Sequence, residues 1–103
     1  MAIQSTLLGN TTIAISPDLT QDAAITAMLF CNLNTVVEYI DVHVVASGAT
    51  PTNTNKIVNQ APIDPNDTFV FSTERLVLGS NDRIYALTTT SNGCSVTVSY
   101  VTI

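Results

Sequence analysis

The sequence predicts an all-β protein, a single antiparallel β-sandwich of immunoglobulin-like or jelly-roll-like type with about seven to nine short strands. No stretch of about eleven residues keeps a 3.6-residue apolar period, so a helical fold is excluded. Apolar and polar residues instead alternate in short runs, and turn residues separate these runs every 8–12 residues or so. We expect the 103 residues to form one domain, residues 1–103, in which residues 1–10 are an arm or an edge strand.

The first third of the chain contains three expected strands. "QSTLLG" (4–9) and "TTIAIS" (11–16) are short strands that flank Gly9-Asn10. "AAITAMLFCN" (23–32) is longer, and we expect both of its faces to be covered. A strict two-residue period would place Ile25, Ala27, Leu29 and Cys31 on one face and Met28 and Phe30 on the other.

The clearest strand is "VVEYIDVHVVAS" (36–47). One face carries Val36, Ile40, Val42 and Val44, and we expect this face to point into the core. The other face carries Val37, Tyr39, Asp41, His43 and Val45. This second set predicts a partly apolar, exposed surface. "GATPTNTN" (48–55) follows, and it is too polar to be anything but an exposed loop.

The rest of the chain alternates strands with turns. "KIVNQAPI" (56–63) is a strand that Pro62 restricts to a sheet edge or a strand end. The turn "DPND" (64–67) leads to the strands "TFVFST" (68–73) and "LVL" (76–78). After the turn at 79–82 come "RIYALTTT" (83–90) and "CSVTVSYVTI" (94–103). The residues expected to point inward together are Ile40, Val42, Val44, Ile84, Ala86, Val96 and Val98.

The turn before "RIYAL" holds two of the few charged residues, Asp82 and Arg83. An Asp in a turn can accept hydrogen bonds from free backbone N–H groups. Arg83 can pair with a carboxylate or reach a neighbouring subunit. We expect a turn-stabilising role for this pair ahead of a binding site.

Composition excludes several classes of function. Charged residues make up only 11% of the chain and hydrophobic residues 46%, and the net charge is −5. Only Lys56, Arg75 and Arg83 are positive, so the basic patch of a nucleic-acid-binding protein is missing. We expect no membrane span, because no apolar run approaches about 18 residues. Because the first residues lack a basic region and an apolar run, we also expect no secretion signal.

Catalytic and metal-binding patterns are weak. A single histidine, His43, excludes a multi-histidine site, and we expect no metal or cofactor. Asp41 and His43 are two apart on one strand face, like a catalytic dyad, but a polar surface pair is the simpler interpretation. Asp64 and Asp67 could offer carboxylates to Ca²⁺, although such turns mostly bond backbone N–H groups. The sequence therefore predicts a protein that is not an enzyme.

The chain has two cysteines, Cys31 and Cys94. A bridge between them is possible, but we expect free thiols, because a chain that folds in a reducing cytoplasm keeps its cysteines reduced.

The order of three short motifs, "MLFCN", "VHVVASG" and "LVLGSNDRIYA", resembles small virion structural proteins of tailed bacteriophages. The likeness extends from about residue 11 to the end, with Ala46 and Asn81 where such chains often carry Pro and Gly. The resemblance implies a β-sandwich that is assembled in the host cytoplasm and resides in the virion. It binds other virion proteins and forms a homo-oligomer, and a trimer is implied because decoration proteins of this kind often occupy three-fold positions.

Within the virion we expect a capsid decoration (cement) protein, and a neck, tail or baseplate component is the alternative. The residues proposed for protein contacts are Val37, Tyr39, Asp41, His43, Val45 and Arg83. Residues 2–8 could cross to a neighbouring subunit as an added strand. A competing class is a carbohydrate-binding host-adhesion module. Sugar platforms usually expose aromatic rings, and only Tyr39 and Tyr85 are candidates here.

Overall fold

The fold is the predicted β-sandwich, seen in a computed structural model that describes residues 2–16, 20–71 and 76–103. Within these residues there is no helix, and hence no helix that could span a membrane. Residues 72–73 of the expected strand 68–73 lie outside the described part. The strands are β1 (Ala2–Leu8), β2 (Ile13–Ala14), β3 (Ala23–Asn32), β4 (Glu38–Val45), β5 (Lys56–Ile63), β6 (Thr68–Phe71), β7 (Leu76–Leu78), β8 (Arg83–Leu87) and β9 (Cys94–Thr102).

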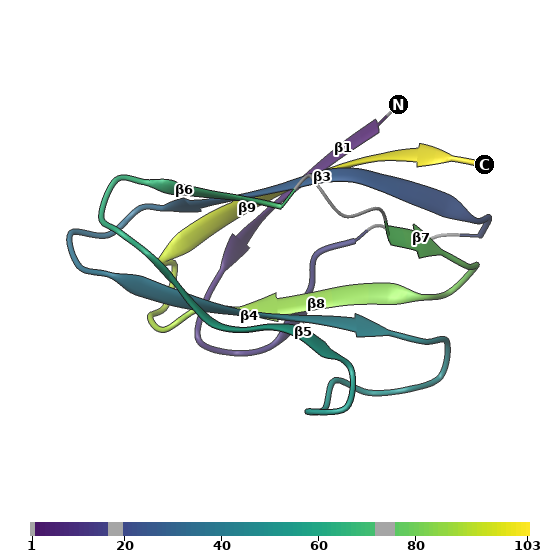
Figure 1. Cartoon of the computed structure of the whole chain (residues 1–103), viewed down its shortest axis with the longest axis horizontal. Coiled ribbons are helices and arrows are strands. Elements are labelled where there is room, and N and C mark those ends of the chain that lie inside the picture. The colour runs from purple at the N-terminus through teal and green to yellow at the C-terminus, as the bar shows by residue number, and fades with distance from the viewer. Residues whose placement is uncertain (1, 17–19, 72–75) are drawn as a thin grey trace.

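The strands form two antiparallel sheets that pack face to face (Figure 1). The larger sheet has the order β1-β9-β3-β6, and β7 pairs with the other half of the β3 edge. The smaller sheet has the order β2-β8-β4-β5. β5 therefore lies at an edge, as Pro62 predicts.

The first strand is an edge strand of its own sheet. β1 pairs with β9 in continuous register, from Ala2 opposite Tyr100 to Leu8 opposite Cys94. In this single chain, residues 2–8 therefore complete their own sheet, and both chain ends lie at the same end of the sandwich (Figure 1).

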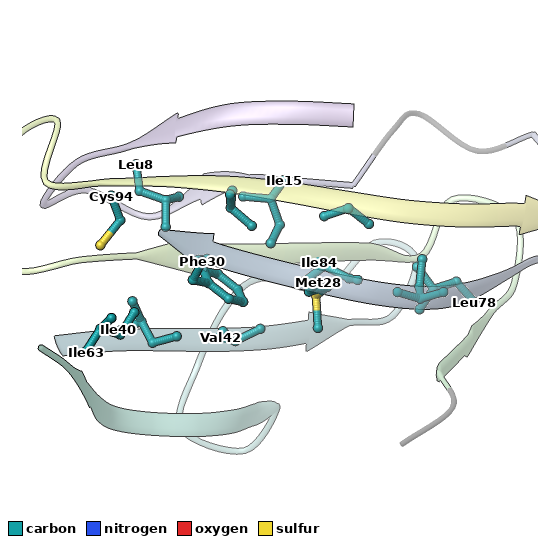
Figure 2. Close-up of a cluster of buried hydrophobic side chains, with 14 of the residues drawn as sticks. Leu8, Ile15, Met28, Phe30, Ile40, Val42, Ile63, Leu78, Ile84 and Cys94 are labelled. Carbon is teal, nitrogen blue, oxygen red and sulfur yellow. The ribbon is translucent and has the colours of Figure 1, made fainter. Parts of the chain in front are cut away.

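The core fills the space between the two sheets (Figure 2). Six of the seven residues predicted to point inward are fully buried, and the seventh, Val44, is half-buried and packs against the same cluster. Val36 was expected on this face, but its side chain is 54% exposed. The reason is that β4 begins at Glu38, so Val36 lies before the strand and does not follow its alternation.

The predicted alternation along β3 is wrong in its first half. The register of β3 with β9 shifts between Ile25 and Ala27, so a β-bulge lies at Thr26. A bulge inserts one residue and moves the following side chains to the opposite face. Ile25 is therefore buried together with Met28 and Phe30, whereas Leu29 is 41% exposed on the outer face. That face is not covered, contrary to expectation.

Three tight turns share one device, an asparagine with a positive φ at the third position. These are Asn66 (φ 63°), Asn81 (φ 68°) and Asn92 (φ 59°). Each turn is closed by a backbone hydrogen bond from its fourth residue to the carbonyl of its first. A turn with a left-handed third residue favours Gly or Asn there. Asn81 therefore occupies a turn position at which glycine is otherwise common.

Candidate interaction surfaces

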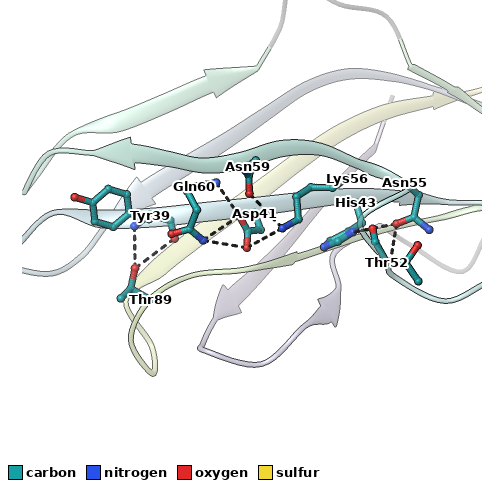
Figure 3. Close-up of polar contacts among 9 residues, drawn as sticks. All are labelled: Tyr39, Asp41, His43, Thr52, Asn55, Lys56, Asn59, Gln60 and Thr89. Atoms are coloured by element: carbon teal, nitrogen blue, oxygen red, sulfur yellow. Dashed lines mark hydrogen bonds and ion pairs between the residues drawn. The ribbon is translucent and has the colours of Figure 1, made fainter.

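The β4 face proposed for protein contacts is mostly buried. Asp41 and His43 are each only 6% exposed, and Val45 is 1% exposed. Val37 and Arg83 are half-buried, and only Tyr39, at 41%, is exposed. The expectation of an open, partly apolar surface along β4 is therefore wrong. Neighbouring backbone covers this side of the strand, as the polar contacts of Asp41 and His43 demonstrate (Figure 3).

Asp41 holds an irregular part of β5 in place. Its Oδ1 accepts the backbone N–H of Gln60 at 2.7 Å, and both carboxylate oxygens accept the Gln60 side-chain amide at 3.2 Å. Gln60 has a φ of 54°, and the β4–β5 register shifts beside it. Lys56 Nζ lies 3.6 Å from Asp41 Oδ2. The carboxylate thus stabilises a β-bulge in which the backbone of a non-glycine residue is strained.

His43 fastens the long loop between β4 and β5. Its Nδ1 lies 2.9 Å from the Thr52 carbonyl oxygen and 3.0 Å from Asn55 Oδ1. Asn55 Oδ1 also accepts the Thr52 N–H at 2.9 Å, and the Asn55 amide donates to the Thr50 carbonyl. The loop therefore folds back over the outer side of β4. A loop expected only to be exposed is anchored on a buried histidine.

These partners leave no support for a catalytic dyad. The hydrogen bonds of Asp41 reach Gln60, and those of His43 reach the loop, so the two side chains serve different segments. Within residues 2–16, 20–71 and 76–103, no three His, Cys, Asp or Glu side chains gather as a metal site would require.

Asp82 has the turn-stabilising role that the sequence predicts. Its Oδ2 accepts the N–H of Gly79 at 2.9 Å, and its Oδ1 accepts the N–H of Ser47 at 2.9 Å. One carboxylate thus joins the turn before β8 to the end of β4. Arg83, half-buried at the start of β8, lies opposite Val45 on the neighbouring strand.

The open surface lies on the opposite side of the molecule, on the outer side of the larger sheet. We call it the neutral face. Cross-strand register aligns its outward side chains, which are Ile3, Ser5, Leu7, Ala24, Ala27, Leu29, Cys31, Thr68, Val70, Val77, Ser95, Thr97, Ser99 and Val101. Six of them are large apolar residues between 37% and 68% exposed. Exposed apolar residues gathered on one sheet face in this way are typical of an interaction site.

The neutral face carries no charge. β1, β3, β6, β7 and β9 contain no Asp, Glu, Lys, Arg or His anywhere along their length. Ser95, Thr97 and Ser99 place hydroxyl groups along its middle strand, and two of these bond the neighbouring hydroxyls of Ser5 and Thr26. The charged strand residues all belong to β4, β5 and β8 in the other sheet. The two outer sides of the sandwich therefore differ in chemistry.

A buried carboxylate, Glu38, is the polar group that sequence reasoning missed. Its residue is 0% exposed, and four hydrogen bonds reach its two oxygens. Thr88 Oγ1 and the Thr90 N–H donate to Oε1 at 2.9 and 3.1 Å, and Thr90 Oγ1 and Asn34 Nδ2 donate to Oε2 at 2.8 and 3.2 Å. Burial raises the pKa of this carboxyl, but the hydrogen bonds outweigh burial and hold the pKa below its usual value.

Glu38 closes one end of the sandwich. It joins the start of β4 to the turn between β8 and β9, and Asn34 supplies the third segment. Gly93 leaves room for it, because an added Cβ there would lie 2.8 Å from Glu38 Cδ. The signal was present in the sequence. A two-residue period places Glu38 on the same inward face as Ile40 and Val42.

Both cysteines are free thiols, as predicted. Asn32 lies opposite Cys94 across the β3–β9 pair, so Cys94 shares its inward face. Cys31 is the next residue along β3 and points outward. Because the two thiols lie on opposite sides of one sheet, they cannot reach each other.

No family model, curated protein or solved structure among those compared matches the chain.

Proposed function

We propose that this chain is a non-enzymatic structural subunit of a tailed bacteriophage particle, most narrowly a capsid decoration protein. It resides in the virion after assembly in the host cytoplasm, contacts other virion proteins and associates with copies of itself. The observation that carries the proposal is the neutral face. The resemblance of the three sequence motifs to virion proteins is its second support. The described strands that form the neutral face contain no charged residue, on a protein of net charge −5.

The chemistry of the neutral face favours docking onto protein. Its half-exposed Leu29 and Val70 lie opposite each other across β3 and β6, flanked by uncharged hydroxyl side chains. Burying such a surface removes apolar area from water without stripping water from ions. Charged residues are depleted at the cores of protein interfaces for the same reason. A lattice of virion proteins is a partner that would cover the face permanently.

The carbohydrate-binding alternative has less support. All six aromatic residues lie in the described part, and only Tyr39 is exposed. Tyr85 is half-buried and lies opposite His43, four residues along β4 from Tyr39. That separation is about 13 Å at the usual rise of a strand. Two rings so far apart do not make one stacking platform for a sugar.

The proposal is tested by adding the purified chain to separated particle parts. Empty heads, necks and tails are prepared without the chain, from the structural proteins encoded beside it, and co-sedimentation is measured with each. Saturable binding to heads supports the decoration role. Binding only to necks or tails supports the alternative placement. No binding to any part, together with binding on a glycan array, would replace the structural role by host adhesion.

A further inference from the structure

The four exposed edges of the two sheets are not alike. β5 carries three features that discourage pairing with another chain, namely Lys56, the bulge at Gln60 and Pro62. β2 has only two residues. β6 and β7 are short and divide one edge of β3 between them. These edges are each blunted in a way that natural sheet proteins use against edge-to-edge association.

β1 is the exception. Its seven residues, "AIQSTLL", contain no charge, proline or glycine, and its register with β9 is uninterrupted. No described backbone hydrogen bond from another segment reaches its outer side. Its described side-chain hydrogen bonds are that of the Gln4 amide, which donates to the Ile15 carbonyl at 3.2 Å, and that between the Ser5 and Thr97 hydroxyls. A long, uncharged edge of this kind, without a bulge, is a template for an added strand.

The positions of the exposed apolar residues of β1 indicate which strand would pair with its free edge. Ile3 is 68% exposed and Leu7 is 49% exposed, and both lie two residues from Ser5 on the neutral face. An antiparallel pair of identical strands centred on Ser5 places Ile3 beside Leu7 of the second copy, and Leu7 beside its Ile3. Directly opposed side chains in such a pair lie about 4.5–5.5 Å apart and stabilise each other. The two exposed apolar residues thus cover each other.

We infer that two copies of this chain pair through their β1 strands about a two-fold axis at Ser5, so that the larger sheets join into one continuous sheet. The contact is isologous, since each copy offers the same edge. A three-fold ring would need a second open edge on each copy, and the described edges other than β1 are blunted. The geometry therefore favours a two-fold pair over the trimer that the resemblance implies.

The pairing also enlarges the surface proposed for virion contacts. A face four strands wide and up to ten residues long measures roughly 15 by 30 Å, which is less than the ~800 Å² per partner of a standard interface. Joining two neutral faces edge to edge doubles that area. The pairing uses the β1 edge and covers only Ile3 and Leu7 of the neutral face, so it can be tested separately from the proposed contact with other virion proteins.

Light scattering across a concentration series tests the pairing with two matched variants. Ser5→Lys places a lysine against its own copy at the axis. Thr68→Lys makes the same change of charge on the same face at the opposite edge of the sheet. We expect twice the mass of one chain for the wild type and for Thr68→Lys. For Ser5→Lys we expect dimerisation weakened about tenfold or more by like charges directly opposed.

A crosslink tests the register independently of any effect of lysine on folding. Ser5→Cys should form a reducible dimer under mild oxidation, whereas Ser95→Cys, on the neighbouring strand, should give no more than the wild-type background. A wild type that is monomeric or trimeric at all concentrations would overturn the inference. So would equal dimerisation of the two lysine variants, or equal crosslinking at the two cysteine positions. Binding of a monomeric wild type to particles would still support the proposed contact with other virion proteins.

Discussion

The Glu38 carboxylate accepts two hydrogen bonds from Thr90, a residue 52 positions further along the chain. The backbone N–H donates to Oε1 at 3.1 Å, and the hydroxyl donates to Oε2 at 2.8 Å. Together with Thr88 and Asn34, this contact gives both oxygens of a buried charge hydrogen-bond partners, and among the described residues no ion pair reaches it. A buried charge is tolerated when hydrogen-bond donors or opposite charges compensate for the water that it has lost.

Replacing Glu38 by Gln should therefore destabilise the fold. The amide of Gln places a donor where Asn34 and Thr90 now donate, so at least one buried donor loses its acceptor. We expect a loss of about 1–3 kcal/mol in the free energy of unfolding, measured by urea denaturation. Asp64→Asn, at an exposed turn position, removes the same charge and should change stability by less than about 0.5 kcal/mol. Equal effects of the two variants would contradict the assigned role.

Glu38 should also give the fold a specific pH dependence. Its pKa is lowered in the folded protein, so the unfolded chain takes up the proton first as the pH falls. The stability that Glu38 contributes is complete above the ordinary carboxyl pKa, and it is lost as the pH falls towards the lowered folded value. Unfolding measured from pH 7 to pH 3 should show a smaller loss for Glu38→Gln than for the wild type. If the free energy of unfolding fell equally with pH in the wild type and in Glu38→Gln, a contribution of Glu38 to the pH dependence would be ruled out.

Asp41 should matter through the bulge that it stabilises. Asp41→Ala leaves the N–H of Gln60 without its acceptor, and we expect a cost of about 1–3 kcal/mol. Asp41→Asn keeps an oxygen for that N–H and should cost less. Amide hydrogen exchange at Gln60 should be faster in Asp41→Ala than in Asp41→Asn. An unchanged exchange rate in the alanine variant would show that the bulge at Gln60 is stable without the Asp41 carboxylate.

The two thiols should differ in reactivity. Burial raises the pKa of Cys94, and the nearby charge of Glu38 raises it further, although Thr88 acts in the opposite direction. Since the thiolate is the reactive form, Cys94 should stay unreactive in the native protein. Half-exposed Cys31 should react with a thiol reagent first. Denaturation without reductant should release both thiols, and recovery of neither would reveal a disulfide.

The strands were readable from the sequence because their signals are local. The range 23–32 matches β3, and the inward residues of β9 follow strict alternation. The bulges at Thr26 and Gln60 were not predicted, because a bulge is defined by the partner strand as much as by its own residues. They altered which residues are exposed, and with them the location of the open surface.

The expected exposure of the β4 face was wrong for a related reason. The outward residues of β4 alternate like those of an exposed strand, but a loop anchored by His43 and a bulge held by Asp41 cover them. Covering by a distant segment leaves no trace in the strand's own sequence. A search of the sequence for strands without any charged residue would have indicated the neutral face. The strands "AIQSTLL" and "CSVTVSYVT" are two such strands.

The central claim is that the neutral face binds other virion proteins. It is tested by comparing Leu29→Glu with Ile57→Glu in the co-sedimentation assay with particle parts. The two side chains are 41% and 42% exposed, but Leu29 lies on the neutral face and Ile57 lies on β5 of the other sheet. Thermal unfolding verifies that both variants are folded. We predict that Leu29→Glu weakens particle binding about tenfold or more, while Ile57→Glu binds like the wild type. Unimpaired binding of folded Leu29→Glu would contradict the claim.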